Sequence, residues 1–213
     1  MHSQLGQDLW ILESTNFKRN GFFIDIGAYD GILHSNTYLL EKDYGWNGIC
    51  VEPSHKFIEL LGSRKSLLDN SLIYAESNMQ IEFRETPHNF ELSGIPSCFN
   101  KDGHEHNREK YYSRILKTLS LTDLCIKYNT PSIIDYLSID TEGSELKILE
   151  THNFNRYRFN HISVEHNRCQ EYREKIKQLL ISNNYELDTG DRFSKINSSD
   201  STNFDDWYTY RGC

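Results

Sequence analysis

The sequence lacks several features that would place it in common classes of protein. Its 31 Asp and Glu residues outnumber its 23 Lys and Arg residues, so it has no basic excess of the kind that follows nucleic-acid phosphates. No apolar run approaches the roughly 20 residues of a membrane span, and the first residues do not read as a signal peptide. The five cysteines include no C-x-x-C pair, which argues against a zinc site or a disulfide framework. We therefore expect a cytoplasmic protein that binds neither nucleic acid nor membrane and acts on a small or neutral substrate.

The length and the order of apolar runs indicate one α/β domain over residues 1–213. A chain of 213 residues can bury its own core but is too short for two ordinary enzyme domains. Strand-like and helix-like runs alternate, which predicts βαβ units and a mostly parallel sheet of seven strands. The expected strands are residues 21–28, 49–53, 72–76, 135–141, 162–165, 185–189 and 207–210. The expected helices are residues 4–15, 35–43, 55–61, 121–128, 144–150 and 171–182.

Residues 86–112 break this alternation. The stretch is polar and is interrupted by prolines and glycines. A loop of this length within a compact domain is usually functional or disordered, and here it would lie at the ligand-binding edge of the sheet. We interpret it as a substrate lid. His104 and His106 within it are too few ligands to predict a zinc site.

The most informative stretch is residues 22–31, Phe-Phe-Ile-Asp-Ile-Gly-Ala-Tyr-Asp-Gly. A buried strand runs into Gly27 and Gly31, which allow a sharp turn and let a ligand approach the backbone. About 20 residues later the next strand ends in Glu52, whose carboxylate would reach ribose hydroxyls beside that turn. The G-x-G-x-x-G spacing of nicotinamide sites is absent, and Asp25 would repel phosphates. An acid at that place suits the ammonium and sulfonium charges of S-adenosylmethionine.

Four blocks in order resemble the FkbM family of S-adenosylmethionine-dependent methyltransferases. They are Ser-Gln-Leu-Gly-Gln-Asp at 3–8, Asp-Ile-Gly-Ala-Tyr-Asp-Gly at 25–31 with Ser-Asn-Thr at 35–37, Gly-Ile-Cys-Val-Glu-Pro at 48–53, and Leu-Ser-Ile-Asp-Thr-Glu-Gly-Ser-Glu at 137–145. The resemblance implies a Rossmann-like class I methyltransferase fold, with an antiparallel last strand and helices on both faces of the sheet. It implies methyl transfer to hydroxyls of sugars or polyketides. The chain also resembles methyltransferase domains of giant-virus glycan-synthesis enzymes, which points to a glycan acceptor such as a rhamnose and to the host cytoplasm.

The resemblance also implies which residues bind the cofactor. They are Gln7, Asp25, Gly27, Tyr29, Asp30, Ser35, Asn36, Glu52, Pro53, Ala75, Glu76 and Asp140. In this scheme Glu52 takes the ribose hydroxyls, Ala75 and Glu76 end the third strand near adenine, and Gln7 closes over the cofactor together with Gln4. Tyr29 departs from the generic motif, in which a second glycine is common.

Methyl transfer to a hydroxyl also needs a group that removes or delocalises its proton. Asp140 and Glu142 follow the fourth expected strand, and Glu165 and His166 follow the fifth, so we expect these four side chains to cluster. We favour His166 as the general base, because a pKa of about 6.5 leaves it mostly neutral at pH 7. Asp140 would orient His166 or the acceptor, and Glu142 is the alternative base. Asp140, Glu142 and Glu165 could instead hold Mg²⁺, a route that we favour less.

Two other functions remain open at this level. One is a nicotinamide-dependent Rossmann oxidoreductase, which the missing glycine spacing disfavours. The other is a non-catalytic glycan-recognition domain that keeps the fold of a cofactor-binding protein. An O-methyltransferase for a saccharide or another small hydroxylated acceptor is the function that the sequence favours.

Overall fold

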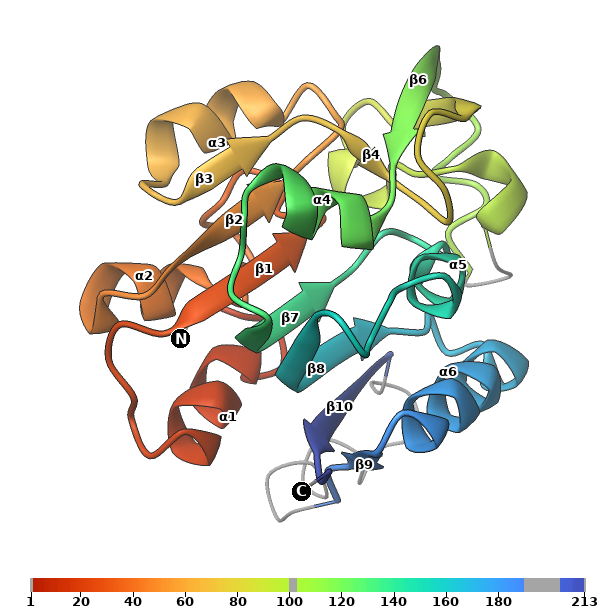
Figure 1. Ribbon diagram of the computed structural model, residues 1–213. Helices are drawn as coiled ribbons and strands as arrows, with labels where there is room; N and C mark the ends of the chain where they lie inside the picture. Colours follow the sequence, from red (N-terminus) through yellow and green to blue (C-terminus); the bar gives the residue numbers. More distant parts are fainter. Residues whose placement is uncertain (1, 100–102, 190–203, 213) are drawn as a thin grey trace.

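The computed structural model describes residues 2–99, 103–189 and 204–212 and is built on a seven-stranded sheet (Figure 1). The strand order is β3-β2-β1-β7-β8-β10-β9. The strands are β1 (Phe22–Ile26), β2 (Asn47–Val51), β3 (Leu67–Asp69), β7 (Ile133–Ile139), β8 (Arg158–Glu165), β9 (Tyr185–Leu187) and β10 (Asp205–Tyr210). The first five strands in this order, β3, β2, β1, β7 and β8, pair in parallel with their neighbours. In contrast, β10 runs antiparallel to both β8 and β9. The expected Rossmann-like α/β fold, with an antiparallel last strand, is confirmed.

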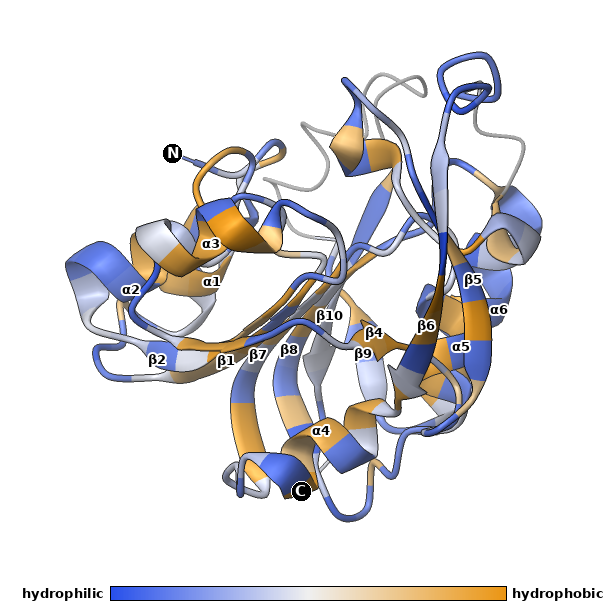
Figure 2. Ribbon diagram, turned by 90° about the horizontal axis from the view of Figure 1, so that it is seen from above, coloured by the Kyte–Doolittle hydropathy of each residue, from blue (hydrophilic) through white to orange (hydrophobic). Residues whose placement is uncertain are grey.

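Helices cover both faces of this sheet, as the view in Figure 2 shows. One layer contains α1 (Gln7–Ser14), α2 (Tyr38–Tyr44) and α3 (Phe57–Ser63), and the other contains α4 (Leu121–Lys127), α5 (Glu145–Glu150) and α6 (Gln170–Ser182). The first helix begins later than expected, because Gly6 before it has a left-handed φ of 89°. Within the described part of the chain, no helix combines the length and the apolar character needed to cross a membrane.

The sheet divides the hydrophobic core into two parts. Side chains alternate between the two faces of a strand. Phe23 and Tyr136 therefore pack with Trp10 on the side of α1, whereas Ile24 and Leu137 pack on the side of α4 to α6. All five side chains are buried. Burial on both faces explains why β1 and β7 are nearly continuous apolar runs in the sequence.

The prediction that residues 72–76 form the third strand of the main sheet is wrong. The third strand of the main sheet is β3, and β4 (Leu72–Ile73) belongs to a separate three-stranded sheet with the order β4-β6-β5. The other two strands of that sheet, β5 (Gln80–Glu85) and β6 (Tyr112–Leu119), pair antiparallel and were not expected. Much of β6 is exposed, including Ile115 at 63%, so its sequence carries no clear apolar alternation.

The expected lid is the loop that joins β5 to β6. It contains two short 3₁₀ helices, η1 (Phe90–Leu92) and η2 (Pro96–Cys98), and residues 100–102 within it lie outside the described residues. Gly94 and Arg84 exchange backbone hydrogen bonds of 2.9 and 3.0 Å, which fix the loop to β5. We call residues 86–99 the cap.

Candidate functional site

A cavity of about 360 Å³ lies at the carboxyl ends of β1, β2, β7 and β8. Open α/β sheets bind ligands at this edge, where the strand order reverses and the loops diverge. The loops after these strands form most of the cavity wall, and residues 89–95 of the cap form another part of it. The volume lies within the usual range for small-molecule sites.

Gly27, at the end of β1, allows two loops to touch. Its φ is +85°, and a Cβ there would lie 1.8 Å from the main-chain oxygen of Asp140. The N–H groups of Gly27 and Ala28 both donate to Val51 O, and Asp140 N–H donates to Ile26 O at 3.0 Å. Glycine is thus required for the contact with the loop after β7. From the sequence alone, Gly27 was expected to let a ligand approach the backbone.

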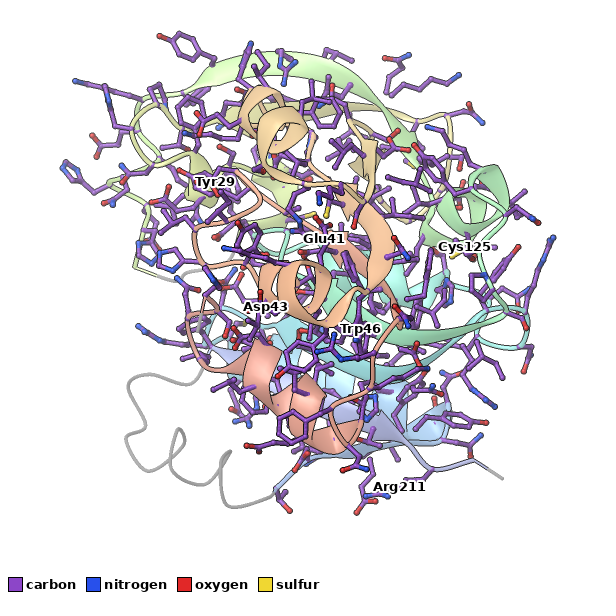
Figure 3. All side chains as sticks on the ribbon, turned by 90° about the vertical axis from the view of Figure 1, so that its left-hand side faces the viewer. Tyr29, Glu41, Asp43, Trp46, Cys125 and Arg211 are labelled. Atoms are coloured by element: carbon purple, nitrogen blue, oxygen red, sulfur yellow. The ribbon has the colours of Figure 1, made fainter. Side chains whose placement is uncertain are left out.

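Asp25, in β1, is buried within a polar network. The Thr37 hydroxyl donates to Asp25 at 2.5 Å, and Arg64 Nη2 donates to the same hydroxyl at 2.9 Å. Arg64 also donates to Ser35 Oγ and to Glu41, which is labelled in Figure 3. Burial raises the pKa of Asp25, and the Arg64 guanidinium opposes that rise. Asp25 and Ser35 line the cavity, so Arg64, which no sequence pattern indicated, holds this side of the site in place.

Asn36 offers the cavity a hydrogen-bond acceptor. Its Nδ2 donates to Ser138 Oγ at 2.9 Å. Its Oδ1 is buried without a partner among the residues that the structure describes. Because Asn36 lines the cavity, a ligand that donates a proton could satisfy this oxygen.

Glu52 follows β2 and lines the cavity, as expected, and is 7% exposed. Its two carboxylate oxygens accept the backbone N–H groups of Tyr29 at 2.9 Å and Ser54 at 2.8 Å. Burial raises the pKa of Glu52, and these hydrogen bonds counteract the rise. Each oxygen has further acceptor capacity, so Glu52 can also bind ligand hydroxyls. Tyr29 and Pro53 line the same part of the cavity.

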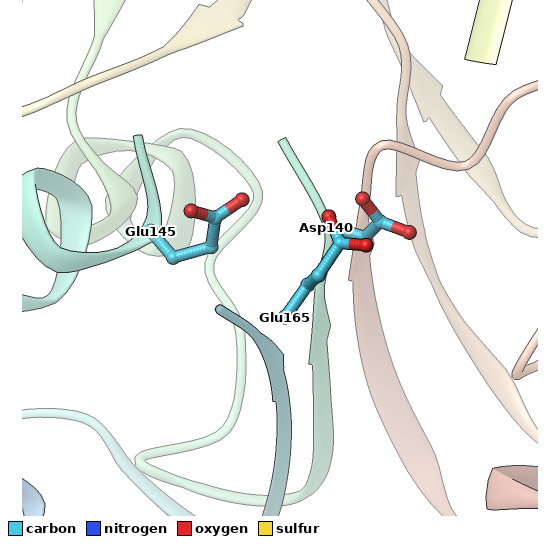
Figure 4. Close-up of side chains that lie close together, drawn as sticks. All are labelled: Asp140, Glu145 and Glu165. Atoms are coloured by element: carbon cyan, nitrogen blue, oxygen red, sulfur yellow. The ribbon is translucent and has the colours of Figure 1, made fainter. Parts of the chain in front are cut away.

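Two buried carboxylates and one that is half-buried, Asp140, gather where β7 and β8 end (Figure 4). Asp140, Glu145 and Glu165 each bring an oxygen within 4.8 Å of the other two. Burial raises the pKa of all three, to about 7 for Glu145, and the Asp140 carboxylate raises that of Glu165 further. Carboxylates in this arrangement could hold a divalent ion. The set differs from the expected one, because Glu145 takes the place of Glu142.

Glu142 is engaged by an arginine that sequence reasoning did not single out. Arg108 Nη2 donates to Glu142 Oε2 at 2.6 Å, and both side chains are nearly buried. The carboxylate of Glu142 is therefore held in an ion pair with Arg108. Although Glu142 lines the cavity, this contact argues against its expected role as the alternative base.

His166 lies outside the cavity. Its side chain is 2% exposed, and among the described residues neither ring nitrogen has a hydrogen-bond partner. Its Nε2 is 3.8 Å from Asp206, and burial lowers its pKa to about 4. A general base must reach the proton that it removes. The structure therefore does not support the expected role of His166 as the base.

Gln7 and Asp30 also lie outside the cavity wall, contrary to expectation. Gln7 Nε2 donates to Asp205 at 2.7 Å, which joins α1 to β10. Asp30 Oδ1 accepts the N–H groups of Ile32 and Leu33, both at 2.8 Å. Asp30 thus shapes the turn after β1, and Gln4 is the N-terminal residue that lines the cavity.

Ala75 and Glu76 do not line the cavity either. Their carbonyl oxygens accept the hydroxyls of Thr151 and Thr118, away from the cavity wall. The expectation failed because residues 72–76 are not the third strand of the main sheet. Residues 71–73 form that part of the wall instead.

The cap contributes side chains that sequence reasoning had not named. Asn89, Phe90 and Leu92 line the cavity, with Tyr29 on the opposite loop. The Lys56 ammonium lies 5.2 Å from the Tyr29 ring and 5.6 Å from the Phe90 ring, so it bridges the two loops. Amide and aromatic groups side by side suit a ligand that has both hydroxyls and apolar faces.

Comparison with known proteins identifies the family of this chain. A profile described as methyltransferase FkbM domain matches residues 25–204, which is most of the chain. A solved structure, "crystal structure of a putative RNA methyltransferase PH1948 from Pyrococcus horikoshii", is similar at 14% identity and a TM-score of 0.41. That match covers 86% of this chain and 66% of the other, just under two thirds. No curated protein matches the chain. By its profile match, this chain belongs to the methyltransferase FkbM domain family.

Proposed function

We propose that this methyltransferase uses S-adenosylmethionine to methylate a hydroxyl of a saccharide or of another small hydroxylated acceptor. The observation that carries the proposal is Glu52, a buried carboxylate that lines a cavity at the switch point of the sheet. An acid there binds the vicinal hydroxyls of a nucleoside. A rhamnose-containing viral glycan, inferred from sequence resemblance, stays a prediction.

The cavity residues fit S-adenosylmethionine chemically. Glu52 would accept ribose hydroxyls in charge-assisted hydrogen bonds. The buried Asp25 and the Oδ1 of Asn36, which has no partner among the described residues, suit the positively charged methionine end. Leu72 and Phe83 provide an apolar wall for a base. When bound, the cofactor supplies an electrophilic methyl group on a sulfonium.

The chain itself must orient the acceptor, exclude water and receive a proton. Orientation can contribute roughly 7 to 11 kcal/mol to such a displacement. The cap and the loops after β7 and β8 all line the cavity and are suited to this positioning. Because His166 lies outside the cavity, a group that lines it must receive the acceptor proton, and the carboxylates of Asp140 and Glu165 are among those groups.

Calorimetry and product analysis test the proposal together. We expect the protein to bind S-adenosylmethionine but not NAD, and to add a methyl group to an oxygen in a panel of glycans and small alcohols, detected by mass spectrometry. Absence of S-adenosylmethionine binding would refute the cofactor assignment. Methylation confined to nitrogen or carboxyl groups would refute transfer to a hydroxyl, and glycan binding without the cofactor would favour a recognition domain.

A further inference from the structure

Arg108 connects the cap to the end of β7. Its Nε donates to Leu92 O at 3.0 Å, and its Nη2 donates to Glu142 at 2.6 Å. Its guanidinium carbon lies 4.4 Å from the centre of the Phe99 ring. Leu92 and Phe99 lie in different parts of the cap, so one side chain holds the cap at two places and the loop after β7 at a third.

Gly94 brings the backbone of the cap against the same loop. A Cβ on Gly94 would lie 3.3 Å from both Thr141 O and Glu142 Cβ, and 2.9 Å from a ring carbon of Phe99. Gly94 is not among the glycines with a left-handed φ, so it is needed here for space. The two backbone hydrogen bonds to Arg84 hold its other side. The cap is thus packed between β5 and the loop after β7.

The chemistry of this contact requires an arginine. The planar guanidinium can donate to a carbonyl and a carboxylate in different directions while stacking on a ring, which an ammonium cannot do. Both charged groups are nearly buried, so removing either one breaks this ion pair in a poorly solvated place. Residues of the cap that line the cavity, such as Asn89 and Phe90, therefore depend on Arg108 for their position.

We propose that Arg108 is a positioning residue that sets the acceptor side of the cavity by anchoring the cap to Glu142. The acceptor then lies between the cap and the end of β7. The assignment of an acceptor to this space rests on the proposed function, but the anchoring contact itself does not. In this scheme Glu142 serves as the anchor of the cap.

Hydrogen exchange in the ligand-free protein tests the anchor without any turnover. Arg108→Gln should speed exchange of the amides of Leu92, Gly94 and Cys98, whose backbone hydrogen bonds lie within the cap or join it to β5. Arg173→Gln is the matched control, because Arg173 pairs with Asp206 at 2.8 Å outside the cavity wall. It should leave these amides unchanged. Unchanged exchange of the cap amides in Arg108→Gln would overturn the proposal.

Kinetics test the positioning role. Arg108→Gln should lower kcat/KM for the acceptor by roughly 10²-fold, the scale of a small misplacement, while calorimetry gives the wild-type Kd for S-adenosylmethionine. The kcat/KM of Arg108→Lys, which keeps the charge, should lie between those of wild type and Arg108→Gln. The Arg108→Gln, Glu142→Gln double variant should be no worse than the worse single variant, because the two residues act as a pair. Additive losses, or a loss confined to the Kd of the cofactor, would contradict the proposal.

Two further measurements separate the possible failures. If Arg108→Gln does not fold, Gly94→Ala displaces the cap without removing a charge, and it should produce the same faster exchange and the same loss of kcat/KM. Wild-type exchange in Gly94→Ala would then overturn the packing argument. If the wild-type protein does not bind S-adenosylmethionine, the proposed function fails, and the exchange data alone decide whether Arg108 anchors the cap.

Discussion

Replacing Glu52 with alanine tests the cofactor assignment most directly. A ligand hydroxyl that donates to this carboxylate forms a charge-assisted hydrogen bond, with a contribution of about 1.5 to 3 kcal/mol. Every 1.4 kcal/mol changes Kd tenfold, so Glu52→Ala should bind S-adenosylmethionine roughly 10- to 100-fold more weakly than wild type. Isothermal titration calorimetry measures this directly.

The same substitution also removes support from two loops. Glu52 accepts the N–H groups of Tyr29 and Ser54, and leaving a buried donor without an acceptor costs about 1 to 3 kcal/mol. Glu52→Ala should therefore also lower the free energy of unfolding. In Glu52→Gln one of these N–H groups would face an amide nitrogen, so this variant should recover only part of the affinity and part of the stability.

A control variant separates binding from stability. Asp135 also accepts a backbone N–H, that of Phe22 at 3.0 Å, but near the start of β7, at the opposite edge of the sheet. Asp135→Ala should lower the unfolding temperature and leave the Kd for S-adenosylmethionine unchanged. Wild-type affinity in Glu52→Ala would refute the assignment of Glu52 to the ribose. An equal loss of affinity in both variants would mean that destabilisation alone weakens binding.

Three other predictions follow from the site. His166→Asn should keep the wild-type kcat, and a loss of roughly 10²-fold or more in a turnover assay would restore His166 as the base. Burial lowers the pKa of His166 to about 4, so its proton is bound more weakly in the folded state, and this residue by itself should lower the free energy of unfolding by about 2 kcal/mol between pH 7 and pH 5. Urea unfolding of His166→Asn should lack that loss. Gly27→Ala should fail to give a cooperative thermal transition by circular dichroism, because its Cβ would overlap Asp140 O at 1.8 Å; a melting curve like that of wild type would contradict the geometry. EDTA should leave turnover unchanged, whereas inhibition that Mg²⁺ reverses would assign the cluster of Asp140, Glu145 and Glu165 to a metal.

The sequence was most informative where strands are buried on both faces. β1, β2 and β7 are mainly apolar runs, and all three were located. β8 has several polar residues in its first half and was located only from Ile162 onward. The position of the third strand was predicted wrongly because Leu67-Leu68-Asp69 and Leu72-Ile73 are both short segments with two apolar residues. Only tertiary packing decides which of the two segments joins the main sheet. β5 was missed although it has a usable signal, with Ile81 and Phe83 alternating with polar residues.

The site could be predicted only to the level of strand ends. Glu165 and His166 are consecutive, and side chains alternate across an extended strand end, so only one of them faces the cavity. The structure shows that it is Glu165. Nothing in the local sequence distinguishes the two. Arg64 lies 23 positions from Glu41 and 27 from Thr37, and Arg108 lies 16 from Leu92 and 34 from Glu142, and contacts at such separations leave no local pattern.

The second sheet has a consequence for how this enzyme can diversify. The loop that carries the cap begins after Glu85 and ends before Tyr112, two residues that face one another in the register of β5 and β6. These two strands are not part of the seven-stranded sheet that carries Glu52 and Asp25. Loops tolerate changes of length and sequence better than the elements that hold their ends. The loop between Glu85 and Tyr112 can therefore change, by evolution or by grafting, while the strands that carry Asp25 and Glu52 stay the same. A graft that retains an arginine opposite Glu142 should exchange one acceptor specificity for another.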